Sequence, residues 1–257
     1  MNNQRLSVIL ITLSIAAGIF FSTRLYSIPG EQRGLVTFTE GSVRKKQPAE
    51  EKWMTAAKDT TVISGDRVRT LDQSRAEIQL RELDVLRMAP RTTINIEKLY
   101  EETKERRDRT DIQVEQGDIW ALVGSEDSGT DFNVGTPVAG AAITGTIFRM
   151  SVGRDSSTEL KVYRGEVRLT NAPRRTDLKP QPITPVQPRK VSGPGKVSGP
   201  REISLEEWVY VVKGMQRIKV DPEGQVESAG DFSFEDPEEQ SEWILWNRER
   251  DEMLLKH

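Results

Sequence analysis

Cysteine is absent from this 257-residue chain, and its only histidine is His257, the final residue. The absence of thiols excludes disulfides, thiolate metal sites, cysteine nucleophiles and an acylated N-terminal cysteine. A terminal side chain is rarely held firmly enough for catalysis, so histidine triads and histidine metal sites are nearly excluded as well. We therefore expect no metal and no cofactor, and we assign no catalytic residue.

Motifs that bind nucleotides or calcium are also missing, as is the His-Glu-x-x-His zinc motif. The run from Gly135 to Gly140 has the glycine spacing of a phosphate loop, but it lacks the Lys-Ser/Thr pair, and Pro137 removes a backbone donor. Counting carboxylates leaves a glycosidase pair open, yet none lies in an apolar strand setting that would raise its pKa. The sequence therefore predicts a protein that is not an enzyme.

Long apolar runs are scarce: the mean hydropathy is -0.56 and 30% of residues are charged, which describes a soluble body. The exception extends from Leu6 to Phe21, between Arg5 and Arg24. The 18 uncharged residues from Leu6 to Thr23 are near the short limit for crossing a bilayer. An uncleaved anchor is favoured over a cleaved signal because no small-x-small cleavage site is well formed. A buried helix is the third alternative, and both leading ones export the chain after Arg24.

Alternating polar and apolar residues dominate from Gly34 to Thr170, as in the run from Arg75 to Leu80. Glycine turns separate such runs, with spacings that are loosely multiples of about 25 residues. We predict an all-β fold, a sandwich or roll of short antiparallel strands. A β-solenoid-like stack of hairpins is the alternative.

Two acidic residues, Asp66 and Asp118, follow turn glycines, where an aspartate side chain commonly accepts hydrogen bonds from backbone NH groups. We expect both to be structural. The dense charges of residues 101–110 indicate a solvated loop or hairpin tip.

Residues 171–201 form a predicted linker with seven prolines, seven basic residues and one acidic residue. Proline favours extended, unpacked backbone, so a spacer is the default interpretation. Contact of its positive charge with anionic lipid, lipopolysaccharide or cell-wall polymer is the alternative.

Residues 202–257 read as a β-hairpin followed by a helix that starts near Asp236 and Pro237. Twelve carboxylates and three basic residues make residues 221–257 strongly acidic. The helix is predicted to be amphipathic and to dock on its own domain, with docking on a partner as the alternative. Its expected apolar face consists of Trp243, Trp246, Arg250, Met253 and Leu254.

Residues 34–170 also contain an ordered series of motifs that resembles the FecR domain. The most specific parts are Gly-Asp-x-Val-Arg-Thr, from Gly65 to Thr70, and Thr-Pro-x-Ala followed by Gly-Thr-x-Phe, from Thr136 to Phe148. The chain departs from the family at residues 81–85, where a glycine turn is usual, so this hairpin should be less tight. The motif residues are Gly41, Trp53, Gly65, Asp66, Thr70, Pro90, Gly117, Trp120, Thr136, Pro137, Gly145, Thr146, Phe148 and Gly165.

We expect these motif residues to be structural. The glycines suit positions where a side chain would clash or where φ is positive. Trp53 and Trp120 are expected to fill the core. Four parts are predicted: a membrane anchor or signal (1–27), the FecR-like domain (34–170), the linker (171–201) and the C-terminal segment (202–257).

The best-known FecR-like proteins are transmembrane regulators with a cytoplasmic domain that binds a sigma factor. Only five residues precede the apolar run here, so we do not carry over the anti-sigma role. The resemblance implies a non-enzymatic module in the periplasm or at the cell surface, held at the inner membrane by the segment from Leu6 to Phe21. Its expected partner is an envelope protein or a cell-wall or surface polymer, and not nucleic acid. The alternatives are a membrane-anchored signalling accessory that senses an envelope partner, and a secreted or periplasmic protein after signal cleavage.

Overall fold

The computed structural model describes residues 32–81, 84–103, 108–124, 130–171, 180–182 and 209–256. The predicted N-terminal helix and anchor, nearly all of the predicted linker and His257 lie outside these residues. The described residues form one compact unit. Within the described part of the chain, no helix combines the length and the apolar character needed to cross a membrane.

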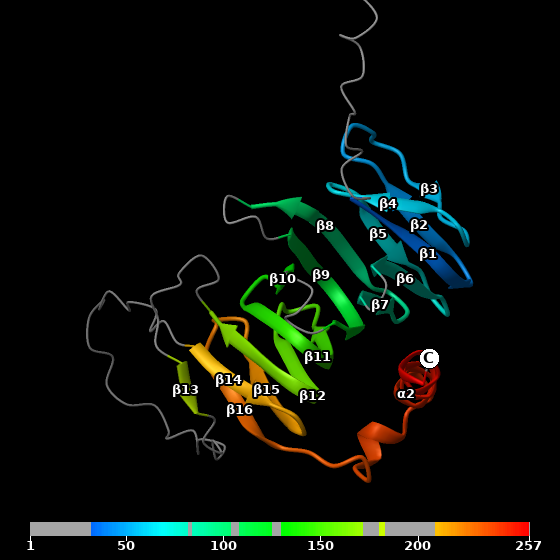
Figure 1. The fold of residues 1–257 in the computed structure, drawn as a ribbon. Coiled ribbons are helices and arrows are strands. Elements are labelled where there is room, and N and C mark those ends of the chain that lie inside the picture. Colours follow the sequence, from blue (N-terminus) through cyan, green and yellow to red (C-terminus); the bar gives the residue numbers. More distant parts are fainter. Residues whose placement is uncertain are drawn as a thin grey trace, which may run out of the picture. The chain divides into compact units, whose positions relative to one another are not determined.

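The described residues are mostly β-sheet, with one α-helix near the C-terminus, which confirms the predicted all-β class in its coarse form (Figure 1). A short 3-10 helix, η2 (Pro237–Gln240), precedes the α-helix α2 (Glu242–Leu255). The strands are β1 (Arg33–Glu40), β2 (Val43–Lys46), β3 (Met54–Thr55), β4 (Thr61–Ile63), β5 (Arg67–Thr70), β6 (Arg75–Arg81), β7 (Asp84–Met88), β8 (Thr93–Glu102), β9 (Asp108–Leu122), β10 (Thr130–Gly135), β11 (Gly140–Val152), β12 (Thr158–Thr170), β13 (Pro180–Pro182), β14 (Val209–Lys213), β15 (Gln216–Val220) and β16 (Val226–Asp231).

Three long strands, β9, β11 and β12, change partners along their length, each at a glycine. Gly117, Gly145 and Gly165 have φ values of +99°, +59° and +85°, which residues with a Cβ rarely adopt. In β11, for example, residues before Gly145 pair with β10 and the last residues of β12, whereas residues after it pair with β9 and the first residues of β12. The glycines therefore let a strand pass from one group of paired strands to another.

Two series of paired strands result, and the three long strands belong to both. The first series runs β3-β2-β5-β8-β9-β10-β11-β12-β14-β13, and the second runs β4-β1-β6-β7-β9-β11-β12-β15-β16.

The sheet is mixed, and the prediction of antiparallel strands throughout is wrong at two pairs. β10 runs parallel to β9, and β13 runs parallel to β14. At the first pair, the end of β9 is occupied by β7 and β11, so only its beginning has a free edge. Thr130, the first residue of β10, is paired with Asp108, the first residue of β9, and the two strands run in the same direction from there.

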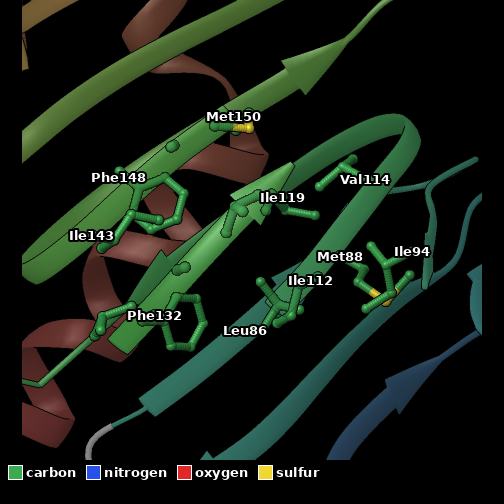
Figure 2. Close-up of a cluster of buried hydrophobic side chains, with 14 of the residues drawn as sticks. Leu86, Met88, Ile94, Ile112, Val114, Ile119, Phe132, Ile143, Phe148 and Met150 are labelled. Carbon is green, nitrogen blue, oxygen red and sulfur yellow. The ribbon is translucent and has the colours of Figure 1, made fainter. Parts of the chain in front are cut away.

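One hydrophobic core receives side chains from both series. Ile94 and Ile112 come from the first series, whereas Leu86, Met88 and Phe148 come from the second, and all are fully or almost fully buried. Figure 2 shows these five side chains within the core cluster. Each large apolar side chain contributes about 1.5–3 kcal/mol when it leaves water. The alternation that the sequence shows therefore positions one face of each series in this core.

The outer face of the second series is also covered, by residues 232–256, which we call the tail. Trp120, Tyr163, Phe232 and Ile244 form a second buried cluster there. Through β14 and β15, residues 209–220 pair with β12. The C-terminal segment thus packs against the predicted FecR-like domain.

Helix α2 confirms the predicted helix, but its buried face differs from the predicted apolar stripe. Its buried residues are Ile244, Asn247 and Asp251. Met253 and Leu254 are exposed, so the prediction is wrong for them. The face differs because buried hydrogen bonds to Asp251 orient α2. The spacing of apolar residues in the sequence does not predict such polar contacts.

Candidate functional site

Threonine hydroxyls link three successive turns at one edge of the fold. Thr70 Oγ1 donates to Ala89 O at 2.5 Å and accepts from Thr92 N at 3.1 Å. Thr92 Oγ1 in turn accepts from Asp118 N at 3.0 Å. The turns after β5, after β7 and within β9 are therefore stacked and held by Thr70, a residue of the FecR-like motif, and by Thr92.

Motif glycines allow these turns to approach closely. A Cβ on Gly117 would lie 2.5 Å from Thr92 Cα, and one on Gly41 would lie 2.5 Å from Ser74 Oγ. Gly41 and Gly65 both have positive φ, +69° and +86°. Any larger residue at these positions would separate the turns or strain the backbone.

The two turn aspartates differ in what they bind. Asp66 is fully buried, where its Oδ2 accepts from Ile63 N at 2.9 Å and pairs with Lys45 Nζ at 2.7 Å. Asp118 instead binds the guanidinium of Arg149 through both carboxylate oxygens, so the expected backbone hydrogen bonds to its side chain are wrong. Burial lowers the pKa of Arg149, but the hydrogen bond and charge of Asp118 outweigh burial and raise it.

Other motif residues lie at turns of β10, β11 and β12. Thr136 Oγ1 accepts from Ala139 N at 3.0 Å and from Thr158 Oγ1 at 2.9 Å. Thr146 Oγ1 donates to Glu166 O at 3.1 Å, and a Cβ on Gly165 would meet the Gly145 carbonyl oxygen at 2.5 Å. Of the remaining motif residues, Trp120 and Phe148 are buried, and Pro90 and Pro137 are exposed.

An open groove of about 520 Å³ lies against the stacked turns, and we refer to it as the groove. At the groove, Arg91 forms an ion pair with Asp72. This ion pair lowers the pKa of Asp72 and raises the pKa of Arg91. The groove is lined by Ser42, Arg69, Thr70, Leu71, Asp72, Arg91, Thr93 and Gln116.

Trp53 stands beside the groove and outside the core, so its expected role as a core filler is wrong. The guanidinium of Arg69 lies 4.1 Å from the centroid of its ring, and that of Arg67 lies 5.6 Å away. Such cation–π contacts hold an arginine in place while they leave it charged. The tryptophan therefore positions Arg69, which also lines the groove.

A buried charge network joins the tail to the second series. Arg87 is fully buried and binds Glu77 at 2.7 Å and Asp251 at 2.5 Å. Trp120 Nε1 donates to Asp251 at 2.7 Å. Burial raises the pKa of Asp251 despite these partners. Burial acts in the same direction on Glu77, but hydrogen bonds from Arg250, Arg87 and Thr37 lower its pKa to about 2.

A second buried ion pair holds η2. Lys161 Nζ lies 2.9 Å from Glu239 Oε1, and both side chains are almost fully buried. The Tyr163 hydroxyl also donates to Glu239, at 2.8 Å. Burial and the charge of Glu239 raise the pKa of Tyr163. Sequence reasoning missed both ion pairs, although single charges within the apolar strands at Arg87 and Lys161 were a signal.

Comparison with known proteins identifies the class of domain. Residues 66–168 match the family model described as "FecR protein", so this segment of the chain is similar to the FecR domain. No curated protein matches the chain. Among the described residues, no group of three or more His, Cys, Asp or Glu side chains is arranged to hold a metal ion.

Two crystal structures of a proposed anti-sigma factor from Parabacteroides distasonis, at 1.65 Å and 2.50 Å resolution, are similar to this chain. Each is 14% identical to it, with a TM-score of 0.42. The match covers 64% of this chain and 59% of theirs, so the chain spans less than two thirds of their length.

Proposed function

We propose that this protein is an exported, non-enzymatic FecR-domain module that binds a component of the cell envelope through the groove. The observation that carries the proposal is the groove itself. All its lining residues except Ser42 fall within the matched segment, and its walls are the turns that Thr70, Thr92 and the motif glycines bring together. A concave surface that is built on rigid turns and carries a few convergent charged and hydroxyl groups is typical of a binding site.

The proposed location follows from the sequence. The apolar segment from Leu6 to Phe21 supports export, with the FecR domain in the periplasm and the segment retained in the inner membrane. Cleavage of that segment would give a secreted or periplasmic protein instead. A reporter that is active only in the cytoplasm, fused after His257, should remain inactive, and strong activity would contradict the topology.

Site-specific photo-crosslinking in cells tests binding at the groove. A photoreactive amino acid replaces Thr93, which lines the groove, and in a matched strain it replaces Ser228, an exposed residue of β16. We expect an envelope adduct from position 93 that is absent from position 228. Equal adducts at both positions, or none at position 93, would contradict the proposal.

A further inference from the structure

The pairing of β2 with β5 places like charges opposite one another beside the groove. Arg44 is opposite Arg69, and Lys46 is opposite Arg67. Residues that are directly opposite in antiparallel strands have Cβ atoms about 4.5–5.5 Å apart, and like charges there destabilise the sheet. We call these four residues the basic block.

The fold compensates for only part of this repulsion. Glu115 pairs with Arg67, and Trp53 contacts Arg67 and Arg69. Within the described part of the chain, no carboxylate pairs with Arg44, Lys46 or Arg69, and the buried Nε of Arg69 has no acceptor. A cluster of four cations that is held together at a cost in stability, with a carboxylate partner only at Arg67 among the described residues, is suited to a negatively charged ligand.

Neutral hydrogen-bonding side chains continue both rows of the basic block across the sheet. Arg69 is opposite Thr93, and Thr93 is opposite Gln116, both of which line the groove. The second row continues from Arg67 to Asn95 and then to Gln113. Successive rows are about 6.5–7 Å apart, because side chains on one face of a strand recur every second residue. The surface thus offers charges at a regular spacing, beside groups that can bind hydroxyls.

We propose that the basic block and the groove bind a glycan that carries repeating anionic groups, either carboxylates or phosphates. This proposal rests on the groove as the binding site. The four cations contact the anionic groups, and Thr93, Asn95, Gln113 and Gln116 contact sugar hydroxyls. Nucleic acid fits less well, because proteins that bind single strands stack bases on free aromatic rings, whereas Trp53 is already covered by two arginines.

The test measures binding of the full-length chain to four polymers of matched length. Carboxymethyl dextran and phosphorylated dextran carry the two kinds of anion, plain dextran carries none, and single-stranded DNA is a polyanion without the dextran scaffold. We expect binding to at least one charged dextran, no binding to plain dextran, weaker binding to DNA, and lower affinity as salt rises from 50 to 300 mM. The stronger charged dextran identifies the source of the anion.

Two double variants locate the site. Arg44→Gln/Arg69→Gln removes two charges from the basic block, and Arg164→Gln/Arg168→Gln removes two charges from exposed positions of β12. Both change the net charge equally. We expect the first variant to lose affinity about tenfold or more, because charge-assisted hydrogen bonds are lost, and the second to stay within about twofold. The first variant should melt at an equal or higher temperature, since it removes a repulsive pair.

Three results would overturn the proposal: no binding to either charged dextran, DNA binding at least as tight, or equal losses in the two variants. A lower melting temperature of the first variant would also contradict the repulsion argument. If position 93 still crosslinks to an envelope protein while no charged dextran binds, the groove remains the binding site and only the anionic glycan is wrong.

Discussion

Arg87 is a fully buried charged residue whose two carboxylate partners come from distant parts of the chain. Glu77 lies on the neighbouring strand β6, whereas Asp251 belongs to α2. Burying a cation is strongly unfavourable unless its partners are well placed, so this contact determines where α2 docks. The specificity of the docking therefore depends on charge as much as on apolar area.

Replacing Arg87 with methionine tests this view. The Arg87→Met variant keeps a long side chain but leaves Asp251 buried without its cation, so we expect a loss of about 3–5 kcal/mol in the free energy of unfolding. Urea denaturation measures it. The matched control, Arg91→Met, removes an exposed pair with Asp72 and should cost about 0–1 kcal/mol. Similar losses in the two variants would show that the buried pair has no special role.

The lowered pKa of Glu77 predicts that the stability of the protein depends on pH in the acid range. Its folded pKa of about 2 lies below the ordinary 4.5, so its contribution is complete above pH 4.5 and is lost as the pH falls toward 2. Asp251 acts in the opposite direction, because its raised pKa makes protonation favour the folded state. We expect the Glu77→Gln variant to lose about 1–2 kcal/mol less than the parent between pH 5 and 2, since solvent screens part of the interaction. Denaturant unfolding across this range measures the difference, and parallel curves would contradict it.

At the scale of the elements, the long strands bend at glycines. Gly165 lets β12 pass between the two series, and a Cβ there would lie 2.5 Å from the Gly145 carbonyl oxygen. Gly230 in β16 has open space around its Cα, with no atom within 4 Å of an added Cβ. The two glycines therefore provide a matched pair.

We expect Gly165→Ala to destabilise the protein by about 1–3 kcal/mol through backbone strain and overpacking. Gly230→Ala should change stability by at most about 0.5 kcal/mol. Thermal melts of the two variants measure the contrast, with a shift of about 2–4 °C per kcal/mol for a chain of this size. An unchanged melt for Gly165→Ala would mean that the bend tolerates a side chain.

Much of the strand content could be predicted, because local alternation reports which side chains face the core. The pairing partners of the strands could not be predicted, because polar–apolar alternation carries no information about which strands pair. The parallel pairing of β9 with β10, for example, depends on where β9 bends. Alternation also misled at Glu77, a polar position of the alternating run from Arg75 to Leu80 that is buried and pairs with Arg250 of the tail. In α2, the spacing of the apolar residues predicted the helix correctly, but it did not predict which face of the helix docks on the sheet.

At the scale of the whole molecule, the distribution of charge shows where the acidic residues of the C-terminal segment find their partners, which the composition alone did not show. The surplus of carboxylates makes residues 221–257 strongly acidic, and two of these carboxylates, Glu239 and Asp251, pair with Lys161 and Arg87 on the second series. The groove was also missed. Arg69 and Thr70 were interpreted only as parts of a structural motif, and the opposition of Arg44 to Arg69 requires the register of β2 and β5.

Two strands, β14 and β15, hold the C-terminal part of the chain against β12. Five residue pairs join β14 to β12, five more join β15 to β12, and Val212, Ile218 and Val220 are fully buried. Each such side chain contributes about 1.5–3 kcal/mol on burial. Together with the ion pairs of the tail, these contacts should keep residues 209–256 bound even when the covalent connection is cut.

A specific protease site inserted between Lys190 and Lys196, in the proline-rich segment, allows a single cut. We expect the two fragments to co-elute on size-exclusion chromatography and to separate only in denaturant. Val212→Lys places a charge at a fully buried position of β14, and the cut variant should separate without denaturant. Independent elution of the fragments from the cut parent would mean that residues 209–256 are bound only through the chain, and that the predicted domain of residues 34–170 is self-contained.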